Sequence, residues 1–403
     1  MSAAATTSKA RQNPAFGLRR NGQTPDGVVR NAVLVTFIIF LALYPIIDRG
    51  LGLQKMGAVP GILIFTILAL GLNIVVGFAG LLDLGYAAFF AIGGYTAAFL
   101  TSPTSPLAPY FQTNFYVAMI LSFFVAALFG VILGAPTLRL RGDYLAIVTL
   151  AFGEIVPRVI LNLEQWTKGA RGMKAIGVPT LPTVQNGQVG LYEIYNQNQT
   201  EWYYLIFTVG AISVFAIYRL AHSRIGRAWM AMREDELAAG AMGINLVQTK
   251  LLAFAIGASF SGFAGSIWAS MLQFIDPFQF DFSISVIVLA MVILGGIGNT
   301  WGVIFGGAVL GFYDRILTSD ATSWLRGIGA AVDLPVISSV LKEIDLTNFK
   351  FGIFGAALVI LMLTRPEGLF PNRARALEMK GEAGPEAGDA ITTEERTAAG
   401  ARA

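Results

Sequence analysis

The chain contains no cysteine and only one histidine, His222, among its 403 residues. Without cysteine it can form no disulfide, and it cannot assemble a thiolate metal site or a Cys–His nucleophile pair. One histidine is too few for a histidine-rich metal centre. We therefore expect no metal site and no resident cofactor.

Phosphate-binding and nucleic-acid-binding patterns are also missing. The dipeptide Gly-Lys occurs nowhere, so the chain has no Walker A loop with which it could hydrolyse ATP. Gly296, Gly298 and Gly302 miss the dinucleotide-binding spacing by one residue and lie in an apolar segment, so we interpret them as packing residues. Charged residues make up 13% of the chain, and a net charge of +3 scattered among apolar segments does not favour a nucleic-acid partner. We expect no enzymatic activity in this chain.

Apolar sequence is abundant instead. The chain is 55% hydrophobic with a mean hydropathy of +0.64, which is typical of an integral membrane protein in contact with the lipid bilayer. Crossing a hydrocarbon core of about 30 Å takes a helix of roughly 17 to 25 apolar residues, and the apolar runs here are too long and continuous for barrel strands. We predict an all-α protein with about ten transmembrane helices, at 31–47, 58–80, 84–101, 115–136, 144–163, 203–220, 251–272, 283–298, 300–317 and 351–364.

The polar segments predict the orientation. Residues 1–30 and 373–403 are poor in large apolar side chains, and we expect two disordered tails. The segment 31–372 between them is predicted to be one transmembrane domain with long external loops at 164–202 and 318–350. Of the 28 lysines and arginines, 18 fall on the side of both termini and 10 on the other, which predicts that both termini are cytoplasmic. The first apolar run lacks a small-residue cleavage site, which favours a retained span over a signal sequence.

The densest charge cluster lies between two apolar runs, at 219–250, and predicts a cytoplasmic loop over 221–249. Gly243 follows the periodic part of this loop and is a suitable helix stop. Four side chains recur at the spacing of one helical face, namely Ile225, Ala228, Trp229 and Met232. Such a helix either docks on a membrane surface or a partner, or is an ordinary solvated helix between two spans. The periodicity alone leaves both interpretations open.

The same loop resembles a known family. The run GRAWMAMREDELAAGAMGIN, followed by KLLAFAIGASFSGFAGSIWA, is similar to the cytoplasmic-loop motif of ABC-importer permeases, in the version of the branched-chain amino-acid (LivM-type) permeases. In that family the loop forms a coupling helix that sits in a groove on the ATPase subunit and transmits its motion to the membrane helices. The resemblance covers roughly residues 58–372, without the insertion at 318–350 and without the two tails. It implies an ATPase contact made by Arg227, Arg233, Glu234, Glu236, Ala239 and Gly243.

An acidic residue, Asp83, lies between the second and third apolar runs. Asp83 is costly to bury in a membrane unless it faces water or a partner, so it marks either a pathway residue or a short cytoplasmic turn. The surrounding LLDLGYAAFFAIGGYTAA is close to the LivM-type pattern, in which this region flanks the translocation path. The resemblance thus implies pathway roles for Asp83 and Tyr86.

Glu154 lies well inside another predicted span. It either lines the permeation path or pairs with Arg158, four residues further on the same helical face, and the two roles are compatible. The family continues after this span with a Gly-Gly-Pro-Asn-Gly type of loop. Here the loop is TKGARGM, residues 167–173, and its two extra cations leave the substrate less defined.

Small residues predict close helix packing. Gly257, Ser261 and Gly265 are spaced by four, as are Gly298, Gly302 and Gly306. Each set would let a neighbouring helix approach closely. Static packing explains such a pattern more often than a sliding surface does.

The resemblance also implies partners. It points to a permease subunit in a bacterial inner (plasma) membrane that works with a second related permease, two ATP-binding cassette subunits and a periplasmic or extracellular substrate-binding protein. The expected cargo is branched-chain or other neutral amino acids, with urea or short-chain amides as the near alternative. A stand-alone secondary transporter or channel is the rival from another class, but it would have no need of an ATPase-docking loop at 224–243.

Overall fold

A computed structural model describes residues 41–323, except 53, 138, 139, 141, 186, 187, 196, 319 and 321, together with 352, 355, 356, 359 and 363. Both predicted tails lie outside the described residues, as do most of the expected spans 31–47 and 351–364 and nearly all of the loop 318–350. The chain divides into two units at Leu53. In the first, residues 41–51 are helical. The second begins at Gln54 and contains the bundle described below.

Helices of the bundle occupy the positions of eight of the ten predicted spans, with ends that differ by about five residues or fewer when their π-helical continuations are included. Its helices are α2 (Val59–Leu72), α3 (Tyr86–Thr101), α4 (Phe115–Thr137), α5 (Asp143–Asn162), α7 (Gln199–Ala221), α10 (Leu246–Leu272), α11 (Phe282–Gly295) and α12 (Thr300–Phe312). Helix α2 continues as the π-helix η1 (Asn73–Phe78), and α12 as the π-helix η4 (Tyr313–Leu317). Six of the described segments are long and apolar enough to cross a membrane, and α3 is a shorter apolar helix. The full count of ten stays a prediction.

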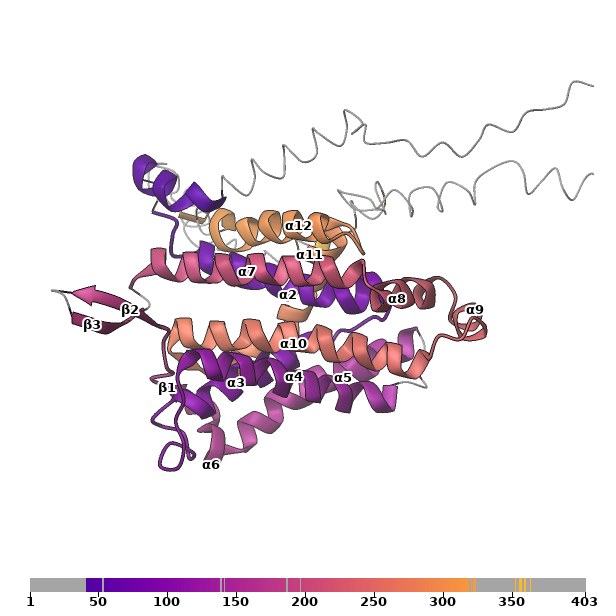
Figure 1. The fold of residues 1–403 in the computed structure, drawn as a ribbon, viewed down its shortest axis with the longest axis horizontal. Helices are drawn as coiled ribbons and strands as arrows, with labels where there is room; N and C mark the ends of the chain where they lie inside the picture. Colours follow the sequence, from indigo (N-terminus) through magenta and orange to yellow (C-terminus); the bar gives the residue numbers. More distant parts are fainter. Residues whose placement is uncertain are drawn as a thin grey trace, which may run out of the picture. The chain divides into compact units, whose positions relative to one another are not determined.

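Helix α10 occupies the centre of the bundle because its surface is built from small residues. It packs against α2, α3 and α4, and Figure 1 shows it running beside α2 and α7. The predicted small-residue set is confirmed as a contact surface: the Ser261 hydroxyl donates to the Tyr86 carbonyl, and Gly265 lies against the backbone of Phe90. On the facing helix, a Cβ added to Gly130 would lie 2.6 Å from the Phe254 carbonyl oxygen. Backbones can approach this closely only where side chains are absent.

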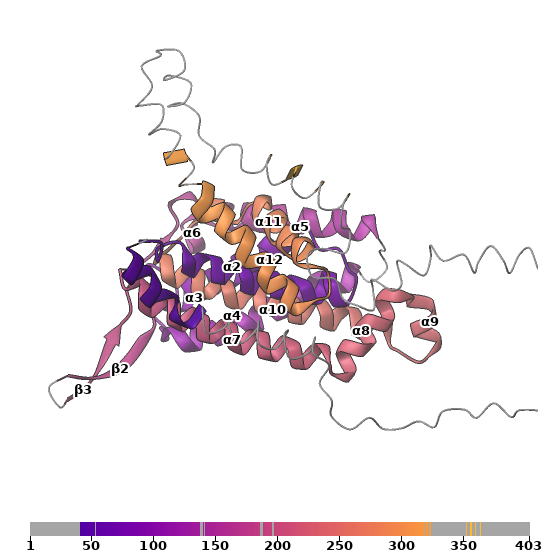
Figure 2. The ribbon, with the colours of Figure 1, turned by 90° about the horizontal axis from the view of Figure 1, so that it is seen from above.

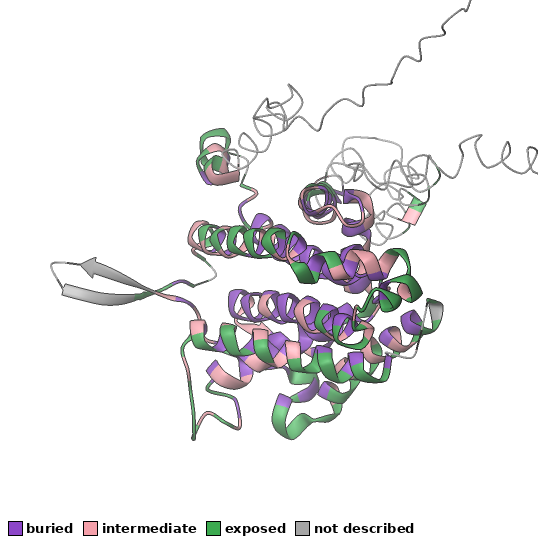
Figure 3. Cartoon of the chain, turned by 45° about the vertical axis from the view of Figure 1, so that its right-hand side comes forward, coloured by how far each residue is buried: buried purple, intermediate pink, exposed green. Residues whose placement is uncertain are grey.

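The outer helices keep one face uncovered within this chain. Burial covers 89% of the α2 span but only 33% of α4, 22% of α7 and 17% of α5. Figure 3 shows exposed residues along the outer helices and buried ones at the centre. The exposed side chains include Phe124, Ile147, Ile155, Ile212 and Phe215. Their apolar character suits contact with lipid or with another membrane subunit.

The segment 164–202 is more structured than the prediction of an external loop and an all-α fold suggested. It contains the short helix α6 (Glu164–Thr167), the 3₁₀ turn η2 (Gly169–Arg171), and a hairpin of β2 (Thr180–Gln185) and β3 (Gln188–Glu193). The strand β1 (Met173–Lys174) pairs antiparallel with β4 (Phe274–Ile275), just after α10. In Figures 1 and 2 the hairpin lies at the opposite end of the bundle from α8 (Arg224–Glu234) and α9 (Glu236–Ala241). The fold is therefore mostly helical with two small sheets.

Candidate functional site

The loop between α7 and α10 forms two helices rather than the single helix predicted. These are α8 (Arg224–Glu234) and α9 (Glu236–Ala241). Asp235 separates them because its carboxylate accepts hydrogen bonds from the backbone N–H groups of Leu237 and Ala238, at 2.7 and 3.0 Å, and so caps the start of α9. Sequence periodicity missed this break, although aspartate between two helical runs is a typical capping residue.

The apolar face of α8 holds the loop to the bundle. Trp229 and Met232 are buried, whereas Ala228 is half-buried and Ile225 is exposed. The Trp229 indole N–H donates to the Thr249 carbonyl at 2.8 Å. Trp229 and Met232, the two largest residues of the predicted helical face, are therefore buried together. Through Trp229 this face contacts α10 of the same chain.

Arg233 reaches from α8 into the end of η1. Its guanidinium donates to the Gly77 carbonyl at 2.5 Å. Its aliphatic part covers Gly80, where an added Cβ would lie 2.6 Å from the Arg233 Cγ. Gly77 in turn adjoins Gly298, whose backbone N–H donates to the Asn73 side-chain oxygen at 2.9 Å. Arg233 therefore links α8 to the ends of α2 and α11.

Three further members of the predicted ATPase contact also have defined surroundings. Glu236 forms an ion pair with the buried Lys250 of α10, at 2.5 Å. Ala239 is only 4% exposed. Gly243 ends α9 with a positive φ of 85°, and the following Ile244 N–H bonds back to the Ala239 carbonyl, which is the glycine-dependent helix ending that the sequence predicted.

The outward surface of the loop is partly apolar. Arg227 and Glu234 are exposed, and in the same loop Leu237 and Met242 are 72% and 84% exposed. Sequence reasoning overlooked these two, although large apolar residues in a charged loop were a usable signal. Residues 232–237, together with residues 79–82 and the start of α5, line a groove next to this surface. Large apolar side chains exposed among charged ones are typical of a protein contact.

Asp83 and Tyr86 lie close together but inside the chain. Asp83 is 1% exposed in the segment 79–85 that joins η1 to α3, and its carboxylate accepts from the Gly85 N–H at 2.9 Å. Burial raises the pKa of this carboxyl to about 7. The Tyr86 hydroxyl donates to the Gly257 carbonyl at 2.9 Å. The segment is thus a packed connection rather than a solvated turn, and pathway roles for both residues stay predictions.

Glu154 and Arg158 form the predicted pair, with 3.4 Å between carboxylate and guanidinium. They lie on the outward face of α5, where their side chains are 46% and 76% exposed. Two charges on the uncovered face of an apolar helix require either water or protein beside them. The pairing of Glu154 with Arg158 is thus present in the structure, and a role for Glu154 in lining the permeation path stays a prediction.

The structure has long apolar helices that pack around a centre of small residues. It also has charged groups on one uncovered face and a structured polar loop at one end. These features define a polytopic membrane protein with the features of a transport subunit. The chain belongs to the family described as branched-chain amino acid transport system permease component, whose model matches residues 60–362.

Relatives support this family. The chain is 37% identical to the high-affinity branched-chain amino acid transport system permease protein LivM of Salmonella typhimurium, over 79% of this chain and 70% of the relative. It is 34% identical to the LivM protein of Escherichia coli, over 88% and 78%. The permease protein LivH of Salmonella typhimurium is 23% identical, over 76% and 90%. No solved structure matches the chain.

Proposed function

We propose that this chain is a permease subunit of an ATP-driven importer of branched-chain amino acids. Membership of the family and the similarity to two LivM proteins support this cargo over urea or short-chain amides. The proposal places the protein in a bacterial inner membrane with both termini cytoplasmic, as the distribution of lysine and arginine favours. Partner ATPases then hydrolyse ATP.

The observation that carries the proposal is the outward surface of α8 and α9. Trp229, Arg233 and the Glu236–Lys250 pair attach this loop to the membrane helices, while Leu237 and Met242 remain exposed. A loop that is attached at several points and exposes two large apolar side chains is suited to receiving a partner and transmitting its motion. We assign Leu237, Met242, Glu234 and Arg227 to the ATPase contact, and Arg233, Glu236, Ala239 and Gly243 to the shape and attachment of the loop.

A second permease is the proposed neighbour of α5. The similarity to a LivH protein indicates that related permeases exist in such systems. The exposed Glu154–Arg158 pair would face that subunit or the water-filled path between the two. A periplasmic substrate-binding protein would dock at the opposite end from α8 and α9, near the β2–β3 hairpin and the exposed Lys168 and Arg171.

The test uses the reconstituted complex. Replacing both Leu237 and Met242 by serine should lower ATPase association and uptake of leucine together, because two apolar anchors lose their contact area. Tyr110, 88% exposed in the loop after α3 at the other end of the bundle, provides the control, and Tyr110→Ser should leave ATPase association unchanged. Normal ATPase association of the double variant would remove the docking assignment. Absence of leucine uptake by the unaltered complex would refute the cargo.

A further inference from the structure

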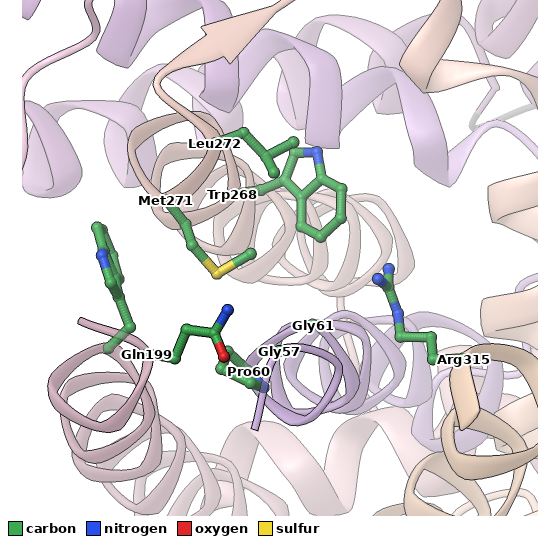
Figure 4. A pocket seen from close by; sticks show the side chains of 9 residues that line it. Gly57, Pro60, Gly61, Gln199, Trp268, Met271, Leu272 and Arg315 are labelled. Carbon is green, nitrogen blue, oxygen red and sulfur yellow. The ribbon is translucent and has the colours of Figure 1, made fainter. Parts of the chain in front are cut away.

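A cavity of about 200 Å³ lies near the end of the bundle that carries the β2–β3 hairpin. It is lined by Gly57, Pro60, Gly61, Gln199, Trp202, Trp268, Met271, Leu272 and Arg315. These residues come from the start of α2, the start of α7, the end of α10 and η4, and Figure 4 shows their side chains around a common space. The cavity is therefore at the opposite end of α10 from the proposed ATPase contact.

Arg315 is the only charged residue among these lining residues. Its guanidinium carbon lies 4.7 Å from the Phe65 ring centroid and 5.1 Å from that of Trp268. Aromatic faces stabilise a cation but use none of its N–H donors. The ion pairs and hydrogen bonds of the described residues include none from the Arg315 side chain. Its donors are thus available to an anion.

The neighbouring lining residues add hydrogen-bond donors and apolar surface. The Trp202 side chain is 1% exposed, and its indole N–H is buried without a hydrogen-bond partner. A buried donor left unpaired is costly, so we expect a water molecule or a bound acceptor beside it. The Gln199 amide lies beside Gly57 at the same cavity, while Met271 and Leu272 supply an apolar wall.

We propose that this cavity binds the carboxylate and aliphatic side chain of the amino acid as it enters from the outer side, with Arg315 as the carboxylate partner. A guanidinium matches a carboxylate through two parallel N–H bonds. Met271, Leu272 and the Trp268 ring contact the apolar part. No acid is among the lining residues, and Asp314, next to Arg315 in the chain, is the acidic neighbour on the side of the substrate ammonium group. This inference rests on the proposed function and assigns a substrate-contacting site to it.

Binding of radiolabelled L-leucine to the assembled permease–ATPase complex, without the soluble binding protein, tests the proposal. Competition with L-leucinamide, which lacks the carboxylate charge, measures how much that group contributes. Arg315→Met should weaken leucine binding about ten- to a hundredfold and abolish the preference for leucine over leucinamide. Arg315→Lys should retain part of the preference. Arg219→Met, at an exposed position in the last turn of α7 and away from the cavity, is the matched control and should leave both unchanged.

A second variant separates binding from folding. A Cβ at Gly61 would lie 2.7 Å from the Arg315 guanidinium nitrogen, so Gly61→Ala should displace that group without removing its charge and should also weaken leucine binding. The proposal is overturned if the folded Arg315→Met or Gly61→Ala complex keeps the wild-type preference. It is also overturned if the wild-type complex binds no leucine, or if added anionic lipid alone occupies the cavity. Leucine uptake by the complete wild-type system would still support the proposed function in each of these cases.

Discussion

Arg233→Ala is the most informative single change in the loop. In the structure Arg233 bonds to the Gly77 carbonyl and covers Gly80, so its removal should detach α8 from the end of η1. The family resemblance implies instead that this residue belongs to the ATPase contact. The two assignments predict different outcomes, because an internal link affects this chain's own stability and a partner contact does not.

The expected magnitude follows from the contact. A hydrogen bond from a charged donor contributes about 1.5–3 kcal/mol, and the loss is larger if the acceptor stays buried and unpaired. Arg233 is half-buried, so we expect a loss near the lower end, about 1.5 kcal/mol. Arg227 on the same helix is exposed, and within the described part of the chain its side chain donates to the His222 carbonyl, at 3.1 Å. Arg227→Ala should therefore change stability by less than about 0.5 kcal/mol.

The assay combines thermal unfolding of the solubilised permease with ATPase association and leucine uptake in the reconstituted complex. Arg233→Ala should unfold at a lower temperature and transport less per ATP hydrolysed, while the ATPases still bind. Arg227→Ala should match the wild type in unfolding temperature. Equal stability of the two variants would refute the internal link. Loss of ATPase association at unchanged stability would return Arg233 to the partner surface.

Two further predictions concern the bundle and the buried acid. Gly130→Ala should lower the free energy of unfolding by about 1–3 kcal/mol, because the added Cβ would lie 2.6 Å from the α10 backbone. Gly134→Ala, one turn later, should cost less, because its Cβ meets only movable side chains at 3.1 Å or more. Equal melting temperatures for the two variants would contradict this account. The pKa of Asp83 is raised to about 7, whereas an aspartate in the unfolded chain has a pKa of about 3.9. The folded state therefore holds this proton more tightly. Stability should fall as the pH rises from about 3.9 to about 7 and should level off above that range. Asp83→Asn should flatten that part of the melting-temperature profile measured from pH 5 to 8, and an unchanged slope would show that another group titrates.

The spans were predictable because each depends on local sequence. For example, length and apolar continuity predict a span at 115–136, and the structure has α4 at Phe115–Thr137. The pairing of Glu154 with Arg158 was also accessible, since residues four apart share a helical face. The helix ending at Gly243 followed from the conformational freedom of glycine.

Contacts between distant segments were not predictable in the same way. Nothing local to Arg233 indicates that it lies against Gly77, and nothing local to Glu236 indicates a pair with Lys250. Both depend on how α7 and α10 bring the loop beneath η1. The cavity around Arg315 likewise joins four segments that are far apart in the chain. Residue type indicated a function for the loop, but only the packing separates its attachment residues from its exposed ones.

The central position of α10 has a consequence for how the protein is made. Among the six candidate spans α10 has the lowest mean hydropathy, and most of it is enclosed by other helices. It carries the buried serines Ser259, Ser261, Ser266 and Ser270, which favour protein neighbours over lipid. Its neighbours α2, α3 and α4 all precede it in the chain, so they are synthesised first. Stable membrane insertion of α10 during translation should therefore depend on these earlier helices remaining nearby, whereas α4, the most apolar span, can enter the bilayer unaided.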